Sequence, residues 1–281
     1  MFLTPLQLAD ELALRDFILL GEIHDNRDHH FLQAWLIRNI ARYDRRPVIV
    51  WEMIGLDQQP ALAAYTDKYD APVTRLGNAL RWTSRGWPDW KLYLPIAEAA
   101  FRYRLKMVAG DASRPDIKAV GRNGIRGINS VRAENLYLNS PLGRKLQTDL
   151  KVQLRESHCG LLPEKALDNM SDVQRFRDAV MADQMVRAGH KAGAVLIAGA
   201  GHVRSDRAVP LYIKNRVPDA SIASLIFSEI SPKIKFAEDV APRSPDGEFA
   251  VDYIWFTPKT QRSDQCAELK KRFVNKQKMK K

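Results

Sequence analysis

Six short apolar runs recur along the chain, and they constrain its fold more than any other feature. Most are separated by segments with helical spacing of apolar residues, as in Asp28–Arg42, Leu92–Tyr103 and Asp172–Ala188. Strands that alternate with helices predict an α/β fold, a mostly parallel sheet with helices on both faces. The predicted strands are Phe17–Leu20, Val48–Met53, Lys106–Ala109, Ala194–Ala198, Ile222–Phe227 and Val251–Phe256.

The length of the chain suits one domain. With 281 residues and 45% hydrophobic content, it can bury a substantial core, and we expect a single α/β domain over residues 1–260. The gap between the third and fourth predicted strands is too long for one crossover. We therefore expect a helical insertion at about residues 112–192, packed over one sheet edge. No apolar run approaches the roughly 20 residues that span a membrane.

The positive charge of the chain is concentrated at its end. The net charge is +11, but Lys270–Lys281 holds seven Lys or Arg and no acid, so the rest carries +11 − 7 = +4. Residues 261–281 are predicted to form a basic, disordered tail. A solubilising role is favoured over contact with a membrane surface or an acidic partner. Aromatic and basic residues do not interleave as in RNA-binding sheets, so no nucleic acid partner is expected.

The compartment is predicted from the N-terminus and the cysteines. The first residues, MFLTPLQLADELALRD, carry acids where a signal peptide has basic residues. Cys159 and Cys266 do not make a disulfide framework, and we expect two small, partly buried thiols. The chain as written is thus expected in the cytoplasm, with association with the cell envelope as the alternative if its start site is mis-assigned.

A local pattern occurs twice. FILLGEIH at 17–24 and VLIAGAGH at 195–202 both read as four apolar residues followed by Gly-x-x-His. Ligands of open parallel sheets bind outside the carboxyl ends of the strands. Glycine lets the chain leave the strand tightly, so each histidine can overhang that edge. If the two strands are neighbours, about 5 Å apart, His24 and His202 face one pocket.

Acidic residues end other predicted strands. Glu22 precedes His24 by two residues, Glu52 ends the second strand and Asp111 follows the third, although a helix-capping role is favoured for Asp111. Burying Glu22 or Glu52 without a partner would cost several kcal/mol. We therefore predict one polar site formed by Glu22, His24, Glu52 and His202. His29 and His30, which begin the next helix, are expected to be solvated.

Several ordered blocks resemble a known family. The segments LLGEIHDNRDHH, WEM, RGWPDWKLYLPIAEAA, ESHCGLLPE, QRFRDAVMAD and LIAGAGHVRSDRAVPLYI are similar to the ChaN-like haem-binding uptake proteins, relatives of the Tiki, TraB and erythromycin-esterase proteins. The resemblance covers Phe17 to about Ile213. It implies an α/β fold with two GxxH halves and haem binding in bacterial iron acquisition.

The resemblance also implies site residues. Glu22, His24, Glu52, and His202 with Arg204 match shared elements of the superfamily, and His158 lies in a block shared with ChaN-like proteins. The family's haem ligand is attributed to a tyrosine, for which Tyr93 is the candidate. Against this, Trp90 and Tyr93 at helical spacing favour core packing. We expect His202 and Arg204 to pair with the haem propionates.

Two functions remain open at this stage, together with a domain that only binds a small molecule. One is a haem-binding protein of haem uptake, with the ligand in a Glu/His-lined pocket and a homodimer as an option. The other is a hydrolase using Glu22, His24, Glu52 and His202, either metal-independent or with Mn, Co or Zn. HExxH and GxSxG motifs are absent. The residues alone leave enzymatic activity undecided.

Overall fold

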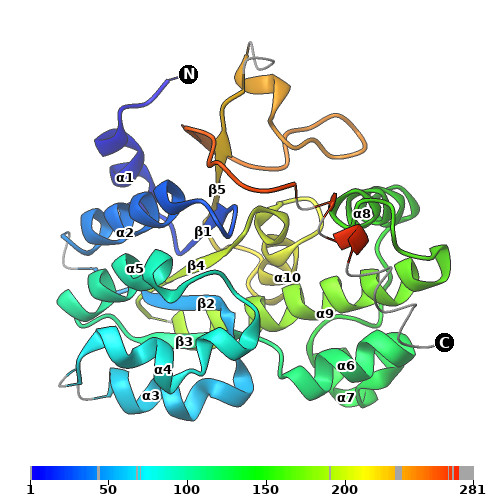
Figure 1. Ribbon diagram of the computed structural model, residues 1–281, viewed down its shortest axis with the longest axis horizontal. Coiled ribbons are helices and arrows are strands. Elements are labelled where there is room, and N and C mark those ends of the chain that lie inside the picture. The colour runs from blue at the N-terminus through cyan, green and yellow to red at the C-terminus, as the bar shows by residue number, and fades with distance from the viewer. Residues whose placement is uncertain are drawn as a thin grey trace.

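The computed structural model shows a sheet between two layers of helices (Figure 1). It describes residues 2–42, 45–67, 69, 71–189, 191–231, 236–264, 266–267 and 269–271. Each of the two helical layers buries its own hydrophobic cluster against one face of the sheet. The α/β class predicted from the alternating pattern is confirmed.

All strand pairs of the sheet are parallel. Its order is β3-β2-β4-β1-β5-β6, and the four strands that lead into the histidines and acids are therefore contiguous. Strands buried on both faces read as continuous apolar runs, which is why the six predicted strands are confirmed. Their bounds are β1 Phe17–Glu22, β2 Val48–Gly55, β3 Met107–Asp111, β4 Ala194–Gly199, β5 Ile222–Glu229 and β6 Tyr253–Thr257.

The helices cover both faces of the sheet. One layer consists of α1 Pro5–Ala13, α2 Arg27–Ala41, α3 Gln59–Thr66, α4 Leu76–Ala79 and α5 Trp90–Arg102. The other consists of α6 Arg114–Asn123, α7 Ser130–Asn135, α9 Glu164–Gly189 and α10 Val209–Arg216. Outside both layers, α8 Arg144–Ser157 packs its leucines with Leu167 of α9 in a third, smaller cluster.

The first turns of two helices are set by side-chain caps. The amides of Asp28 and His29 donate to the side chain of Asn26, so α2 begins immediately after the GxxH segment of β1. At α6, the cap is Ser113, whose side chain accepts from the amide of Asp116. The capping role favoured for Asp111 is therefore wrong, and its carboxylate is available to the site.

The predicted insertion between the third and fourth strands is helical, and it contains α6 to α9. The insertion was predicted to pack over one edge of the sheet, but it packs on a face of the sheet instead. The 26-residue helix α9 lies across β2, β3 and β4 and buries residues such as Phe176 and Met181 in the core of that face. Among the described residues, no helix is both long and apolar enough to cross a lipid bilayer.

The C-terminal part of the chain departs from two predictions. Cys159 and Cys266 form a disulfide, so the expected free thiols are wrong. Arg262 makes ion pairs with Asp25 and Glu229, so the start of the predicted tail is held on the domain. Residues 272–281, most of the basic run, lie outside the described residues. A separation of 107 residues explains why no local spacing indicated this disulfide.

Candidate functional site

The two GxxH strands lie side by side, as their repeat suggested. β1 and β4 pair with Phe17 opposite Ala194 and Glu22 opposite Gly199. The repeat is therefore one residue out of register in space, since Gly21 lies opposite Ala198 and not opposite Gly199. This offset places Glu22 opposite the glycine that ends β4, and the space that a side chain of Gly199 would fill is bordered by His24 and Glu52.

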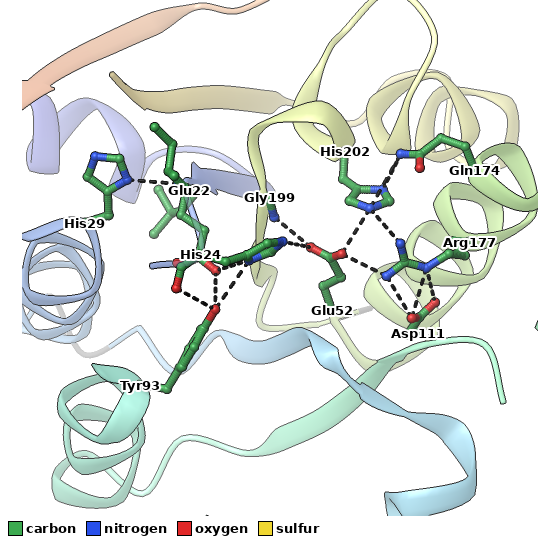
Figure 2. Close-up of polar contacts among 12 residues, drawn as sticks. Glu22, His24, His29, Glu52, Tyr93, Asp111, Gln174, Arg177, Gly199 and His202 are labelled. Carbon is green, nitrogen blue, oxygen red and sulfur yellow. Dashed lines mark hydrogen bonds and ion pairs between the residues drawn. The ribbon is translucent and has the colours of Figure 1, made fainter. Parts of the chain in front are cut away.

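The structure brings Glu22, His24, Glu52 and His202 into one connected network at the carboxyl ends of the strands (Figure 2). We call this network, together with Asp111, Arg177 and Asp178, the rim. His24 follows β1, His202 lies in the short turn after β4, and Glu52 comes from β2 between β3 and β4. The distance between His24 Nε2 and Glu52 Oε2 is 4.0 Å, and His202 Nε2 lies 3.1 Å from Glu52 Oε1.

Glu22 orients His24. The Nδ1–H of His24 donates to Glu22 Oε1 at 2.9 Å, and Tyr93 donates its hydroxyl to the same oxygen at 3.0 Å. His30 Nδ1 lies 2.7 Å from the other carboxylate oxygen. Burial alone would raise the pKa of Glu22, but His30 and His24 lower it below its usual value. Burial alone would lower the pKa of His24, but Glu52 and Glu22 raise it.

Glu52 is fixed on three sides. Gly199 donates its amide to Oε2 at 2.7 Å, and Arg177 donates to Oε1 at 2.8 Å. Burial opposes ionisation, yet His202 and Arg177 hold the pKa of Glu52 well below its usual range. Glu52 is therefore a carboxylate despite being buried, and it accepts bonds where a neutral acid would donate.

His202 is held as an imidazolium. Its Nδ1–H donates to Asp178 Oδ1 at 2.5 Å, and Gln174 contacts the same ring. Burial opposes the charge, but Glu52 and Asp178 raise the pKa of His202 to about 10. A group charged in this way stabilises negative charge at the rim and does not accept a proton near neutral pH.

Two residues of α9 complete the rim, and sequence reasoning missed them. Arg177 bridges Asp111 and Glu52, with its Nε 3.0 Å from both Asp111 oxygens, and Asp178 supports His202. Both lie in the quoted block QRFRDAVMAD. The available signal was polar residues at helical spacing, Gln174 with Arg177 and Asp178, within a helix otherwise buried among apolar side chains.

The structure places both histidines of the first turn of α2 in the interior. His29 and His30 are fully buried, so the expected solvated residues are wrong. Because α2 begins at the rim, its first turn packs beneath the ends of β1 and β6. His29 Nδ1 accepts from the amide of Ile23 at 3.0 Å, while its Nε2–H donates to Thr257 Oγ1 at 2.9 Å. Burial lowers the pKa of His29 to about 4, so its ring is neutral at pH 7.

Three further residues were predicted to belong to the site: Tyr93, Arg204 and His158. Tyr93 is completely buried with its hydroxyl bonded to Glu22, and burial together with Glu22 raises its pKa; its role as an iron ligand stays a prediction. Arg204 pairs with Asp206 through two nitrogens, at 3.0 and 2.6 Å, and not with His202. His158 ends α8, where its Nδ1–H donates to the carbonyl of Leu154 at 2.8 Å.

Within the part of the chain that the structure describes, no group of three or more His, Cys, Asp or Glu side chains is arranged to hold a metal ion. The rim carboxylates are instead engaged by cations and backbone amides.

Two surface hollows lie away from the rim. One, of about 400 Å³, lies between α1 and β6 and is lined by Phe2, Leu8, Phe249, Tyr253 and Trp255 among others. The other, of about 430 Å³, is basic and includes Arg15, Arg45 and Lys191.

These features define a doubly wound α/β protein with a charged site at the carboxyl ends of its central strands. Comparison with known families identifies the family to which the chain belongs. The model of the family "Haem-binding uptake, Tiki superfamily, ChaN" matches residues 8–213, and the chain belongs to this family. The resemblance stated from the sequence blocks is thereby confirmed. No curated protein matches the sequence significantly.

Two solved structures are similar to this chain to different degrees. A structure described as cofacial haem binding to ChaN of Campylobacter jejuni is 24% identical, with a TM-score of 0.63, over 81% of this chain and 86% of that one. The erythromycin esterase EreC, as an H289N mutant in its open conformation, is 15% identical with a TM-score of 0.45, over 80% of this chain and 72% of that one. At 24% identity, the likeness to the Campylobacter jejuni structure concerns the fold alone.

Proposed function

We propose that this protein binds haem, with His24 as the iron ligand, and that it acts in bacterial haem uptake or handling. Family membership supports the ligand, and one observation supports the residue. His24 is the accessible histidine of the rim, because 34% of its side chain is exposed, whereas the figures for His202 and His30 are 6% and 0%.

The setting of His24 fits an iron ligand. Metal-ligating histidines commonly donate their other ring N–H to a carboxylate, which fixes the tautomer and makes the ligating nitrogen more basic. Glu22 accepts from Nδ1 in this way, so Nε2 is the nitrogen left for iron. Trp87 offers apolar surface beside it, with the two ring centroids 5.0 Å apart. Bound haem would supply a Lewis-acidic iron for this imidazole.

Other expected contacts with haem fit less well. The hydroxyl of Tyr93 is buried against Glu22, so in this proposal Tyr93 positions His24 through that carboxylate. The guanidinium of Arg204 is already paired with Asp206, so the proposal gives Arg204 no role in binding a haem propionate. The iron site is thus assigned to one histidine and its supporting carboxylate, in place of a tyrosine.

A titration with hemin tests the proposal. Saturable binding should shift the Soret band. His24→Ala should weaken the affinity for hemin by about tenfold or more, because loss of even a residue that supports a metal ligand typically costs that much. Tyr93→Phe should retain the shift, because the phenol does not touch iron. His158→Ala is the matched control, since that ring lies outside the rim. The absence of a saturable shift at micromolar hemin would exclude haem binding, and unchanged affinity in His24→Ala would exclude this ligand.

A second function is favoured by the same histidine. An exposed imidazole held by a buried carboxylate is also the arrangement of a general base, which contributes about 10² to 10⁴-fold to a rate. In that case His24 would activate water, and the imidazolium of His202 would stabilise developing negative charge. Ester hydrolysis lost in His24→Ala, without haem binding, would favour this function. Stoichiometric Mn, Co or Zn in untagged protein would favour its metal-dependent form.

The disulfide bears on where the protein acts. Disulfides persist in oxidising compartments and are rare in the bacterial cytoplasm. The pairing of Cys159 with Cys266 therefore supports a location in the cell envelope, in place of the cytoplasm expected from the N-terminus. Alkylation of free thiols in intact cells, followed by mass spectrometry, tests this. Recovery of both cysteines as alkylated thiols would contradict it.

A further inference from the structure

The segment that follows β6 passes beside the loop after His24. We call residues 257–264 and 266–267 the C-terminal strap. At its start, Thr257 bonds the ring of His29 at 2.9 Å, and the carbonyl of Pro258 accepts from the side chain of Asn26 at 3.4 Å. Further along, Arg262 Nε donates to Asp25 Oδ2 at 2.9 Å. The strap therefore contacts both residues that directly follow His24.

Glu229, at the end of β5, joins the strap and the loop. Its carboxylate accepts from Asn26 Nδ2 at 2.7 Å, from the amide of Thr260 at 3.1 Å and from Arg262 Nη1 at 2.8 Å. Burial raises the pKa of Glu229, but hydrogen bonds from Arg262, Thr260 and Asn26 outweigh this effect and lower the pKa to about 2. The junction therefore stays charged and bonded throughout the physiological pH range.

The far end of the strap is attached covalently. Cys266 is bonded to Cys159 in the turn between α8 and α9, where the two Cα atoms are 5.6 Å apart. Figure 1 shows this segment as a red trace that runs from the strands to the side of α8. Since α9 carries Arg177 and Asp178, the strap links the His24 side of the rim to the layer that holds His202.

We propose that the Cys159–Cys266 disulfide is a redox-sensitive anchor that holds the strap, and through it the loop Asp25–His29, in place beside His24. A dithiol reductant supplies two electrons and two protons. The S–S bond breaks, each cysteine sulfur takes one proton, and the reductant closes to its own disulfide. Beyond its start at the buried Thr257, the strap without its anchor is held by partly exposed polar bonds such as Arg262 to Asp25, whose side chains are 21% and 31% exposed. Such bonds open readily. The inference does not depend on the identity of the ligand at His24.

Hydrogen exchange of the full chain, followed by mass spectrometry, tests this. Reduction with a dithiol should speed exchange of the amides of residues 25–29 by about tenfold, as for a segment that opens locally. Over the same short labelling time, β4 should stay protected, because that strand is central and buried and its amides exchange only when the whole domain unfolds. The double variant Cys159→Ser with Cys266→Ser should behave like the reduced protein without any reductant.

A second variant separates the strap from the disulfide itself. Arg262→Gln, with the disulfide intact, should also speed exchange at residues 25–29, whereas Lys259→Gln, at an exposed position of the same strap, should not. Unchanged exchange at 25–29 after reduction, with both thiols shown to be free, would overturn the proposal. Loss of protection in β4 within that labelling time would also overturn it, because reduction would then unfold the whole domain and would not release a strap.

Discussion

Charges of opposite sign alternate along the rim. Arg177 lies between Asp111 and Glu52, and His202 lies between Glu52 and Asp178. Each of these groups would be costly to bury alone, but together they compensate one another. His24 differs from them because it is partly exposed, and it is the residue at which this rigid charged layer meets solvent. Stability and binding are thus assigned to different residues.

The charge of His202 predicts how stability depends on pH. Its pKa is about 10 in the fold and about 6.5 in an unfolded chain. Its contribution is complete below about pH 6.5 and is lost as pH rises towards 10, because the folded state then holds a proton that the unfolded state has released. The free energy of unfolding in urea should fall over that range. His202→Asn should flatten the decline, whereas His158→Asn should not. An equally steep decline in His202→Asn would contradict the assignment.

Removing the bridge of the rim should be costly. Arg177→Met leaves Asp111 and Glu52 without their shared cation, and breaking a buried pair by removing one partner typically costs about 3–5 kcal/mol. Arg155→Met is the matched control, because Arg155 pairs with Glu164 at the surface, where a pair contributes about 1 kcal/mol or less. Urea unfolding of the two variants checks this. Equal losses would show that the rim is not a buried network.

The sequence predicts four of the five rim residues at strand ends, since it favoured a capping role for Asp111, and it fails for the rim residues that lie elsewhere. Glu22, His24, Glu52 and His202 interrupt or follow apolar runs, so their placement follows from the topology of a parallel sheet. Arg177 and Asp178 lie in the middle of a long helix, where only the packing of α9 on the sheet shows that they face inward. The burial of His30 was missed for the same reason, because a first turn gives no signal of its tertiary neighbours.

At the scale of the element, the glycines of the repeat allow close packing where β1 and β4 end. A Cβ atom on Gly21 would lie 2.5 Å from Cγ2 of Val203 and 3.0 Å from Cα of Ala200. A Cβ atom on Gly199 would lie 3.0 Å from Nε2 of His24. The two glycines of the repeat therefore allow the turn after β4 to pack on β1 and the ring of His24 to pack on β4.

This close approach predicts the effect of one methyl group. Gly21→Ala should destabilise the fold by about 1–3 kcal/mol, the usual range for overpacking a core. Gly143→Ala is the control, because a Cβ atom there meets nothing within 4 Å, and the only cost expected is that of replacing the N-cap glycine of α8, about 1 kcal/mol or less. Thermal and urea unfolding compare the two. A Gly21→Ala variant as stable as Gly143→Ala would mean that the two strand ends do not pack this closely.

The pattern of apolar residues alone was sufficient to predict the strands and helices, but not to predict which layer of the fold each helix belongs to. Five of the strands are runs of largely buried residues, because both faces of the sheet are covered there, whereas the edge strand β6 is mostly half-buried. The position of α9 did not follow, since a mixed polar and apolar helix fits an edge as well as a face. Only the charges that it contributes to the rim explain why its polar residues are turned inward.

At the scale of the whole molecule, the disulfide closes a loop that contains α9, β4 and β5. It joins residues 107 positions apart, and in the chain-entropy account a loop of about 100 residues gains up to about 4.7 kcal/mol from such a bond. The double variant Cys159→Ser with Cys266→Ser should therefore unfold at lower urea concentration than the oxidised protein. The variant and the reduced wild type should agree. An unchanged midpoint would show that this bond does not stabilise the fold.

The membership of this chain in a haem-binding uptake family, together with an accessible imidazole oriented by a buried carboxylate, makes iron ligation by His24 the central claim. A crystal structure of the haem-loaded protein tests it most directly. We predict iron bonded to Nε2 of His24, with Glu22 still accepting from Nδ1. Iron held by any other side chain, or a porphyrin seated in the apolar hollow between α1 and β6 with His24 unliganded, would contradict it.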